Sequence, residues 1–260
     1  VAVAFHAMTY DCPYIIWLSS FYGMSETEDG AYVSFVDANG GYDYTMTPEE
    51  RDDALDKMYE QINAFVSKNL ITSMTDFEIE LAAHDWLCER SVYDDAAADS
   101  LETGEDEKYV NAWTAYGAII EGRAVCEGYA HALQLVLNYL GIPCAALRVW
   151  SDDEMHMICV VQIDGDWVYI DPTWNDKDAC GLEYTHDFFN LNYDEIKVTH
   201  QIYEPWQTVK KKGQKLDSNF NIYLPESTSK GHNYYKVMGR QINSQAEFNT
   251  VVINQFKALR

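Results

Sequence analysis

Residues 122–171 decide how this chain folds, and they read GRAVCEGYAHALQLVLNYLGIPCAALRVWSDDEMHMICVVQIDGDWVYID. The stretch predicts a helix, then a strand, then a β-hairpin. It contains Cys126, His156 and Asp171, three residue types that together can form a thiol nucleophile, its base and a carboxylate that orients the base. We therefore treat these three residues as the candidate catalytic triad.

The predicted helix begins near Cys126, because apolar residues follow at helical spacing and Gly141 and Pro143 then end it. Cys126 falls in the first turn, where unpaired backbone N–H groups and the positive end of the helix dipole favour a thiolate over a thiol. The adjacent Glu127 works slightly against this effect. The apolar stripe consists of Leu133, Val136, Leu137 and Leu140.

Beyond the helix, residues 144–150 predict a strand and residues 155–163 predict a second one. Apolar and other side chains alternate along the second strand, which separates its two faces. Asp164-Gly165 is a strong signal for a two-residue hairpin turn, after which the chain returns as residues 166–171. One face of the second strand carries Met155, Met157, Cys159, Val161 and Ile163, and the other carries His156, Ile158 and Val160.

The hairpin register relates His156 to Asp171. With a two-residue turn, Ile163 faces Asp166, and counting back places His156 opposite Thr173. Asp171 then points to the same face as His156 and lies within reach of a side-chain hydrogen bond. A shift of one residue in register would put the two side chains on opposite faces. The local pattern leaves a second interpretation open, in which His156 is an ordinary strand residue and Asp171 a strand-end cap.

The first part of the chain predicts scaffold. Residues 1–46 are rich in aromatic side chains and indicate a short helix followed by a few antiparallel strands, with turns at residues 29–30 and 39–41. Capping boxes at residues 47–50 and 75–78 each open a helix. The expected inward residues are Leu55, Met58, Tyr59, Ile62 and Phe65 or Val66 in the first helix, and Ile79, Ala82, Ala83, Trp86 and Leu87 in the second.

The segment between the second helix and Cys126 gives weaker signals. His84, inside that helix, is more typical of a hydrogen-bonding core residue than of a catalytic one. Residues 91–108 are acidic and poor in apolar side chains, so we expect an exposed loop, and their spacing is not that of a calcium-binding loop. A short helix at about residues 111–120 should end at Gly122 and lead to Cys126.

Composition excludes some functions. The chain has 260 residues, 47% of them hydrophobic, and a formal net charge of -24, so it is globular and repels nucleic acid and anionic membrane surfaces. No apolar run is long enough to cross a bilayer. The six cysteines form no CxxC pair, so we expect neither a metal nor a cofactor, and the pairing of five of them stays open: Cys12, Cys88, Cys144, Cys159 and Cys180.

The rest of the chain predicts cover for the core. Residues 172–209 contain further aromatic side chains, and Lys210, Lys211 and Lys212 are typical of a solvated loop. From about residue 218 we expect one or two strands, at IYL and NYYKVM, and a final helix capped at residues 244–247. This part offers no obvious catalytic residue.

Three blocks of the sequence resemble the bacterial transglutaminase-like domains of the papain-like superfamily. Residues 114–144 are similar to the family's nucleophile segment, written Gly-x-Cys-x-Gly-Tyr-Ala, and residues 155–176 to its base strand and Asp-x-[Ser/Thr]-Trp strand end. Residues 75–94 resemble the family's His-Asp-[Tyr/Trp]-Leu helix. Many members continue the base strand as His-Ala-Trp, whereas this chain has His-Met-Ile at residues 156–158, which puts the lining on the substrate side in question.

The resemblance implies an α+β fold in which an antiparallel sheet packs against the Cys126 helix. It implies that Cys126 is the nucleophile, His156 the base and Asp171 the orienting acid. For the oxyanion we look to the Cys126 N–H and to Tyr116 or Trp113, while Trp174 is expected to line the cleft; each of these aromatics is otherwise a core residue. The expected parts are residues 1–70, a transglutaminase-like core at residues 71–204, and an accessory element at residues 205–260.

Two function classes follow. The first is an enzyme that uses its thiol for acyl transfer or hydrolysis on protein or peptide amide bonds, with cell-wall peptide among the candidate substrates. The second is a catalytically silent module that binds peptides or proteins at a cell surface. The chain begins without Met, so we expect a trimmed protein that is secreted or held at the cell surface, while the cytoplasm stays open.

Overall fold

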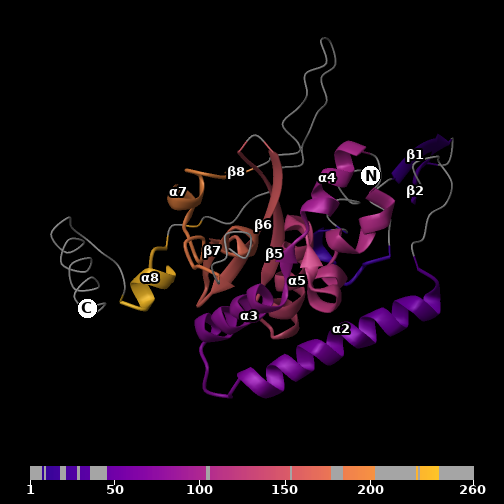
Figure 1. The fold of residues 1–260 in the computed structure, drawn as a ribbon. Helices are drawn as coiled ribbons and strands as arrows, with labels where there is room; N and C mark the ends of the chain where they lie inside the picture. The colour runs from indigo at the N-terminus through magenta and orange to yellow at the C-terminus, as the bar shows by residue number, and fades with distance from the viewer. Residues whose placement is uncertain are drawn as a thin grey trace, which may run out of the picture.

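A computed structural model describes residues 8, 10–17, 22–27, 30–35, 46–103, 106–152, 154–176, 184–202, 227 and 229–239. Figure 1 draws the described residues in colour and labels most of their helices and strands. Their order along the chain is β1 (Tyr22–Thr27), β2 (Gly30–Phe35), α2 (Pro48–Asn69), α3 (Asp76–Arg90), β3 (Val92–Tyr93), α4 (Asp95–Thr103), η1 (Asp106–Trp113), η2 (Gly117–Glu121), β4 (Arg123–Ala124), α5 (Cys126–Tyr139), β5 (Cys144–Ser151), β6 (Glu154–Ile163), β7 (Asp166–Ile170), α6 (Pro172–Asn175), α7 (Tyr193–Ile196), β8 (Gln201–Ile202) and α8 (Tyr234–Val237).

The fold is α+β, as predicted. Its main sheet is antiparallel with strand order β7-β6-β5-β8. Helix α5 packs against β5 and β6, and α3 packs against α5 from the other side, so α5 lies between the sheet and α3 (Figure 1). Among the described residues, none of the helices combines the length and apolarity that crossing a membrane requires.

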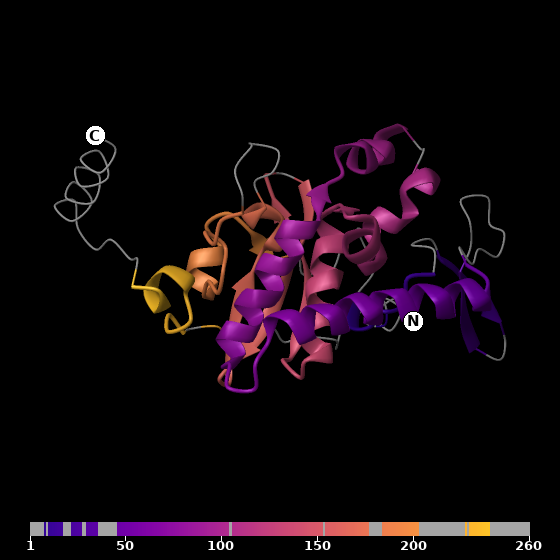
Figure 2. The same cartoon turned by 60° about the horizontal axis from the view of Figure 1, so that its bottom comes forward.

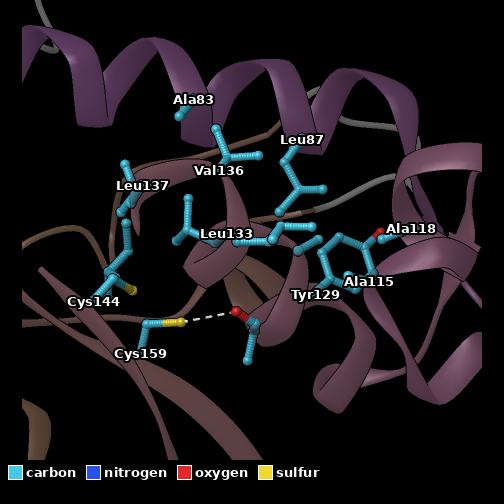
Figure 3. Packing of buried hydrophobic residues seen from close by; sticks show 14 of the residues in the cluster. Ala83, Leu87, Ala115, Ala118, Tyr129, Leu133, Val136, Leu137, Cys144 and Cys159 are labelled. Carbon is cyan, nitrogen blue, oxygen red and sulfur yellow. Dashed lines mark hydrogen bonds between the residues drawn. The ribbon is translucent and has the colours of Figure 1, made fainter. Parts of the chain in front are cut away.

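Helix α5 forms the centre of the main hydrophobic core. All its residues from Gly128 to Leu137 are buried, because the sheet covers one side of the helix and α3 the other. Figure 3 shows this packing, with Leu133 and Val136 of α5 directed toward Ala83 and Leu87 of α3. The Cys159 thiol of β6 donates a hydrogen bond of 3.2 Å to the Ala130 carbonyl. The helix that carries Cys126 is therefore held from both sides.

Strand β6 has the two predicted faces. Met157, Cys159, Val161 and Ile163 belong to the main core with α5, whereas Ile158 and Val160 belong to a second cluster on the opposite face. That second cluster also contains Val149, Tyr169, Leu191 and Ile196. The sheet therefore separates two layers, and His156 shares its strand face with the smaller one.

The hairpin between β6 and β7 has the predicted register. Asp164 and Gly165 form the turn with φ of 51° and 89°, a positive pair that matches the twist of a tight hairpin. Ile163 pairs with Asp166, and the ladder continues to Cys159 opposite Ile170. This count is the one that brings His156 and Asp171 to the same face.

Both predicted capping boxes are present. Thr47 and Glu50 close the start of α2, and Thr75 and Glu78 close the start of α3. Helix α2 runs along the outside of the molecule (Figure 2). It buries four residues, Ala54, Met58, Ile62 and Phe65, which includes three of those predicted.

The buried face of α3 is wider than predicted and contains polar residues. Ala83 and Leu87 are buried as expected, whereas Ile79, Ala82 and Trp86 are only partly buried. The prediction missed the other buried members, which are Phe77, Glu80, His84 and Cys88. Helix α3 packs against α5 with its apolar residues, whereas Asn175 of α6 and Asn190 bind its polar residues His84 and Glu80.

The prediction of an exposed loop at residues 91–108 was wrong. Val92 and Tyr93 form a short strand that pairs in parallel with Arg123 and Ala124, and α4 follows. The Asp94 side chain accepts a hydrogen bond from the Ala97 N–H at 3.1 Å, which caps this helix. The expected α-helix at 111–120 is replaced by a 3-10 segment, η1, and a π-type turn, η2, which ends at Gly122 with φ of 69°.

The ends of the chain agree with the sequence only in part. Strands β1 and β2 pair antiparallel, from Tyr22 opposite Phe35 to Thr27 opposite Gly30, which agrees with the antiparallel strands predicted here. The expected strand at NYYKVM was wrong, because Tyr234–Val237 form the short helix α8, which Asn233 caps. The turn at residues 39–41, Lys210–Lys212, the IYL strand, the final helix and Cys180 lie outside the described residues. The other five cysteines are free thiols.

Candidate active site

Asp171 is fixed by the turn that ends strand β7. It is the N-cap residue of α6, and its Oδ1 accepts hydrogen bonds from the backbone N–H groups of Thr173 and Trp174, each at 3.0 Å. The residue is completely buried. Its orientation therefore depends on the backbone of α6, and Oδ2 is left for side-chain donors.

His156 joins this carboxylate to the start of α5. Its Nε2 donates a hydrogen bond of 2.8 Å to Asp171 Oδ2, as the hairpin register predicts. Because Nε2 serves the carboxylate, Nδ1 is the ring nitrogen left for another partner. The Cys126 thiol lies within electrostatic reach of this imidazole. The structure thus brings together the three residues of the candidate triad.

The charges at this site favour a protonated imidazole. Burial by itself disfavours the charged form of His156, but the charge and hydrogen bond of Asp171, followed by those of Cys126, raise the pKa of His156 to about 10. For Asp171 burial acts in the opposite sense, and the neighbouring imidazoles of His156 and His200 outweigh it and lower the pKa of this carboxyl. A carboxylate and an imidazolium beside a thiol are the electrostatic conditions that support a thiolate.

Cys126 is the first residue of α5 and is half-buried. The preceding β4 pairs in parallel with β3, so Tyr93 stands beside Ala124, two residues from the thiol. Gly128 lets the first turn of α5 approach Ala112 and Ala124 closely. An added Cβ at this position would lie 2.4 Å from the Ala112 carbonyl oxygen and 2.8 Å from the Ala124 Cβ. The first turn of α5 is therefore pressed against η1 and β4.

The order and spacing of these residues match a known family. The profile of the transglutaminase-like superfamily matches residues 64–172, a span that includes Cys126, His156 and Asp171. Residues 64–172 are a transglutaminase-like domain. Among curated proteins, no sequence matches the chain.

Solved structures that resemble this chain include a crystal structure of a TGase, with 15% identity, a TM-score of 0.42, and coverage of 60% of this chain and 44% of that chain. A candidate cysteine protease from Cytophaga hutchinsonii has 18% identity, a TM-score of 0.36, and coverage of 49% and 41%. A candidate protease from Parabacteroides distasonis has 13% identity, a TM-score of 0.34, and coverage of 58% and 30%. The chain spans less than half the length of each. With TM-scores below 0.5, these likenesses carry no argument about function.

The structure explains two departures of this transglutaminase-like domain from the family pattern. Ala124 stands where the pattern has its first glycine, and its methyl group fills space that a side chain at Gly128 would need. Met157 and Ile158 stand where many members have Ala and Trp. Met157 is buried in the main core and Ile158 in the second cluster, so both residues pack inside the domain.

The candidate residues beside the triad lie in different surroundings. The ring of Trp174 lies 5.7 Å from the His156 ring, between centroids. Tyr116 packs against the main core. Trp113 packs against the small cluster that contains Val125, the residue before the nucleophile. The oxyanion role of Tyr116 or Trp113 stays a prediction.

Sequence reasoning missed two residues at this site. His200 is completely buried and its Nε2 donates to Asp171 Oδ2 at 3.1 Å. Tyr93 is raised in pKa, first by burial and then by the negative charges of Cys126 and other nearby groups, which include Asp171. His200 has no signal in the sequence, since it follows a four-residue helix in an irregular segment. Tyr93 lies within residues 75–94, the block that resembles the family's helix, and comes three residues after the end of α3.

Two groups in the described residues bring possible metal ligands within 4.8 Å of one another: His156, Asp171 and His200, and His84, Asp85 and His186. In both groups the possible ligand atoms are hydrogen-bonded to one another. In the second group Asp85 Oδ1 lies 2.8 Å from His84 Nδ1 and from His186 Nε2. His84 Nε2 contacts the Asn175 amide at 3.0 Å. His84 is thus the hydrogen-bonding core residue that the sequence favours, and it supports the α6 turn that orients Asp171.

Proposed function

We propose that this transglutaminase-like domain catalyses thiol-dependent acyl transfer or hydrolysis at protein or peptide amide bonds. The observation that carries the proposal is the 2.8 Å hydrogen bond from His156 to Asp171, with Cys126 within electrostatic reach of the same imidazole. The position of Cys126 at the start of α5 supports the same role, since the helix dipole stabilises negative charge there.

In the proposed reaction the Cys126 thiolate attacks the amide carbonyl carbon and forms a tetrahedral intermediate. The His156 imidazolium gives its proton to the leaving nitrogen, the C–N bond breaks, and an amine departs from a thioester on Cys126. Neutral His156 then takes a proton from water or from a second amine, which attacks the thioester. The products are an acid or a new amide, and the thiolate and imidazolium are restored.

The oxyanion of the tetrahedral intermediate requires hydrogen-bond donors. The Cys126 backbone N–H is the first candidate, and Tyr116 and Trp113 are the candidates for the second. Among substrates we propose peptides, cell-wall peptide included, and no nucleic acid, because the net charge of -24 repels a phosphate backbone. An extracytoplasmic location fits such substrates and is part of this proposal.

Alkylation tests the nucleophile directly. Iodoacetamide at low concentration should label Cys126 well ahead of the other cysteines, and labelling at pH 7 is followed by peptide mass spectrometry. Cys12 is a matched control within the same chain, because it is also half-buried. Slow labelling of Cys126 at the rate of Cys12 would contradict the proposal and favour the silent binding module.

Mass spectrometry of Cys126 separates hydrolysis from transfer. The protein is incubated with a peptide library or with cell-wall peptide, with and without a primary amine. A thioester on Cys126 that resolves only to an acid indicates a hydrolase, and a stable amine adduct indicates a transferase. Cys126→Ser should form neither product. If the native protein forms no acyl adduct with either substrate set, the catalytic proposal fails.

A further inference from the structure

His200 lies between α7 and β8, far along the chain from the residues of the triad. Its backbone N–H donates to the Ile196 carbonyl at 2.9 Å, which continues the turn of α7. The side chain is completely buried. Nevertheless it contacts the charged group at the centre of the site, because Asp171 Oδ2 lies 3.1 Å from its Nε2.

Asp171 accepts four hydrogen bonds, and His200 supplies one of them. Two backbone N–H groups donate to Oδ1, while His156 and His200 donate to Oδ2. An ionised carboxylate has about four lone-pair positions, so this set saturates it. His156 and His200 therefore share one oxygen of the same carboxylate.

The partners of the ring make His200 a donor to Asp171. Nε2 faces a carboxylate oxygen, so it carries a proton. Nδ1 lies 2.8 Å from the Thr199 hydroxyl, which can donate to it. The same hydroxyl can instead donate to the Ile196 carbonyl at 3.4 Å and accept from Nδ1, so His200 donates to Asp171 through Nε2 in either case.

Aromatic rings hold His200 in this orientation. Its ring centroid lies 4.6 Å from that of Trp174 and 5.6 Å from those of Phe188 and His156. Trp174 also contacts His156, so the same indole packs against both imidazoles. The two histidines are thereby kept on one carboxylate in a fixed relative position.

We infer that His200 is a positioning residue of the site, a second imidazole donor that holds Asp171 and sets the pH range over which Cys126 and His156 form a reactive pair. The inference rests on the proposed function and adds a residue that acts through Asp171. By donating to Oδ2, His200 withdraws part of the negative charge that the carboxylate offers to His156.

Other titratable groups also act on this carboxylate and its partners. Cys126 on α5 and His156 on β6 form the pair itself. Tyr93 on β3 and His84 on α3 lie within electrostatic reach of Asp171. The carboxylates of Asp95 and Glu154 act on Tyr93, and Glu127 follows Cys126 directly. None of these side chains is removed when His200 is replaced, so a change in the pH profile reports on the loss of His200.

The test compares His200→Phe, which removes the donor and keeps a ring, with His200→Gln, which offers an N–H donor near the position of Nε2. The readout is the pH profile of Cys126 alkylation by iodoacetamide, together with the imidazole titration of His156 by NMR. His232→Gln serves as a control, because the partner of His232, Asp166, begins β7 at the opposite end of that strand from Asp171.

Loss of the donor leaves more negative charge beside His156, so both limbs of the profile should move to higher pH. We expect a shift of about half to one pH unit in His200→Phe, with the same shift in the His156 titration, and a return toward the wild-type profile in His200→Gln. If His200 had only a structural role, its loss would weaken the ion pair between Cys126 and His156. The acidic limb would then move to higher pH and the alkaline limb to lower pH, so the profile would become narrower.

The outcomes separate the two proposals. If Cys126 of the native protein alkylates no faster than Cys12, the proposed function fails, while the His156 titration still tests the role of His200. If Cys126 is reactive but His200→Phe leaves both the profile and the His156 titration unchanged or only narrows the profile, the inference is overturned. The His232→Gln control should match the native profile.

Discussion

Asp171 shows how much of this site depends on single residues. Its carboxylate is buried, is held by the backbone of α6, and accepts from two imidazoles. Glu80 is the contrasting buried acid. Its Oε2 accepts a hydrogen bond of 2.6 Å from the Asn190 amide, whereas Glu80 Oε1 and Asn190 Oδ1 have no hydrogen-bond partner among the described residues. The first acid has every lone pair used, and the second does not.

Replacing Asp171 with Asn should disable the triad. The Asp171 carboxylate accepts four hydrogen bonds, whereas the NH2 group of an asparagine would face N–H donors and could accept none of them. The negative charge that supports the His156 imidazolium would also be lost. We expect Cys126 alkylation at pH 7 to slow roughly 100-fold or more. The control is Asp164→Asn in the exposed hairpin turn, where Asn also adopts a positive φ. A folded Asp171→Asn variant with the native alkylation rate would contradict the assigned role.

Glu80 should make the folded state less stable as pH rises. Burial raises the pKa of Glu80 from 4.5 to about 8, opposed by the Asn190 hydrogen bond and assisted by the charge of Asp76. The folded state then binds a proton that the unfolded state releases. Stability from this group is therefore complete below about pH 4.5 and falls toward pH 8, with a slope of at most about 1.4 kcal/mol per pH unit.

Glu80→Gln should remove that slope, so its advantage in the free energy of unfolding over the native protein grows between pH 5 and 8. Urea unfolding at several pH values measures it, and the exposed Glu60→Gln on α2 is the control. Parallel stability curves for Glu80→Gln and the native protein would show that the carboxyl is already ionised at low cost.

At the scale of elements, the start of α5 is the critical junction. The sheet and α3 hold the body of the helix, while β4 and η1 press on its first turn. The capping boxes of α2 and α3 fix where those helices begin, but α5 has no side-chain cap on Val125. The place of Cys126 therefore depends on packing around Gly128 instead of on a local capping bond.

Gly128→Ala should displace this junction. The added methyl group would lie 2.4 Å from the Ala112 carbonyl oxygen, so the backbone must move, and we expect a loss of about 1–3 kcal/mol in stability. Cys126 alkylation should slow as well, since the thiol shifts from His156. The control is Gly231→Ala, where the nearest atom to a new Cβ is the Ser229 hydroxyl at 3.4 Å. An unchanged melting temperature and alkylation rate would contradict this view of the junction.

At the scale of the whole molecule, the core extends beyond the matched domain. Helix α2 and the described part of the N-terminal segment join the cluster that surrounds α5. The Gln134 amide of α5 donates a hydrogen bond of 2.8 Å to the Tyr10 carbonyl, and Ile16 is 2% exposed. The early residues therefore stabilise the helix that carries Cys126.

Ile16→Ala should lower the free energy of unfolding by about 2–5 kcal/mol, because it leaves a cavity in the shared core. Chemical denaturation followed by circular dichroism measures the loss. Ile71→Ala is a matched control, because Ile71 is 69% exposed and its truncation should change stability by no more than about 0.5 kcal/mol. Equal effects of the two substitutions would show that the N-terminal segment adds nothing to the core.

The sequence by itself determined the elements whose causes are local. Capping boxes marked α2 and α3, apolar spacing marked α5, and the Asp164-Gly165 turn fixed the register that joins His156 to Asp171. It did not reveal α4, although Asp94 caps that helix, because an acidic segment with few apolar residues resembles a loop. Local signals suffice where neighbours in the chain make the deciding contacts.

Only the tertiary structure decided which separate parts meet at the site. Cys126 and His156 lie on different elements that the packing of α5 on the sheet brings together. His200 and Glu80 are buried because distant segments cover them, and no pattern around either residue records that cover. Burial of a polar side chain depends on a partner from another part of the chain, so its place is decided when the layers assemble.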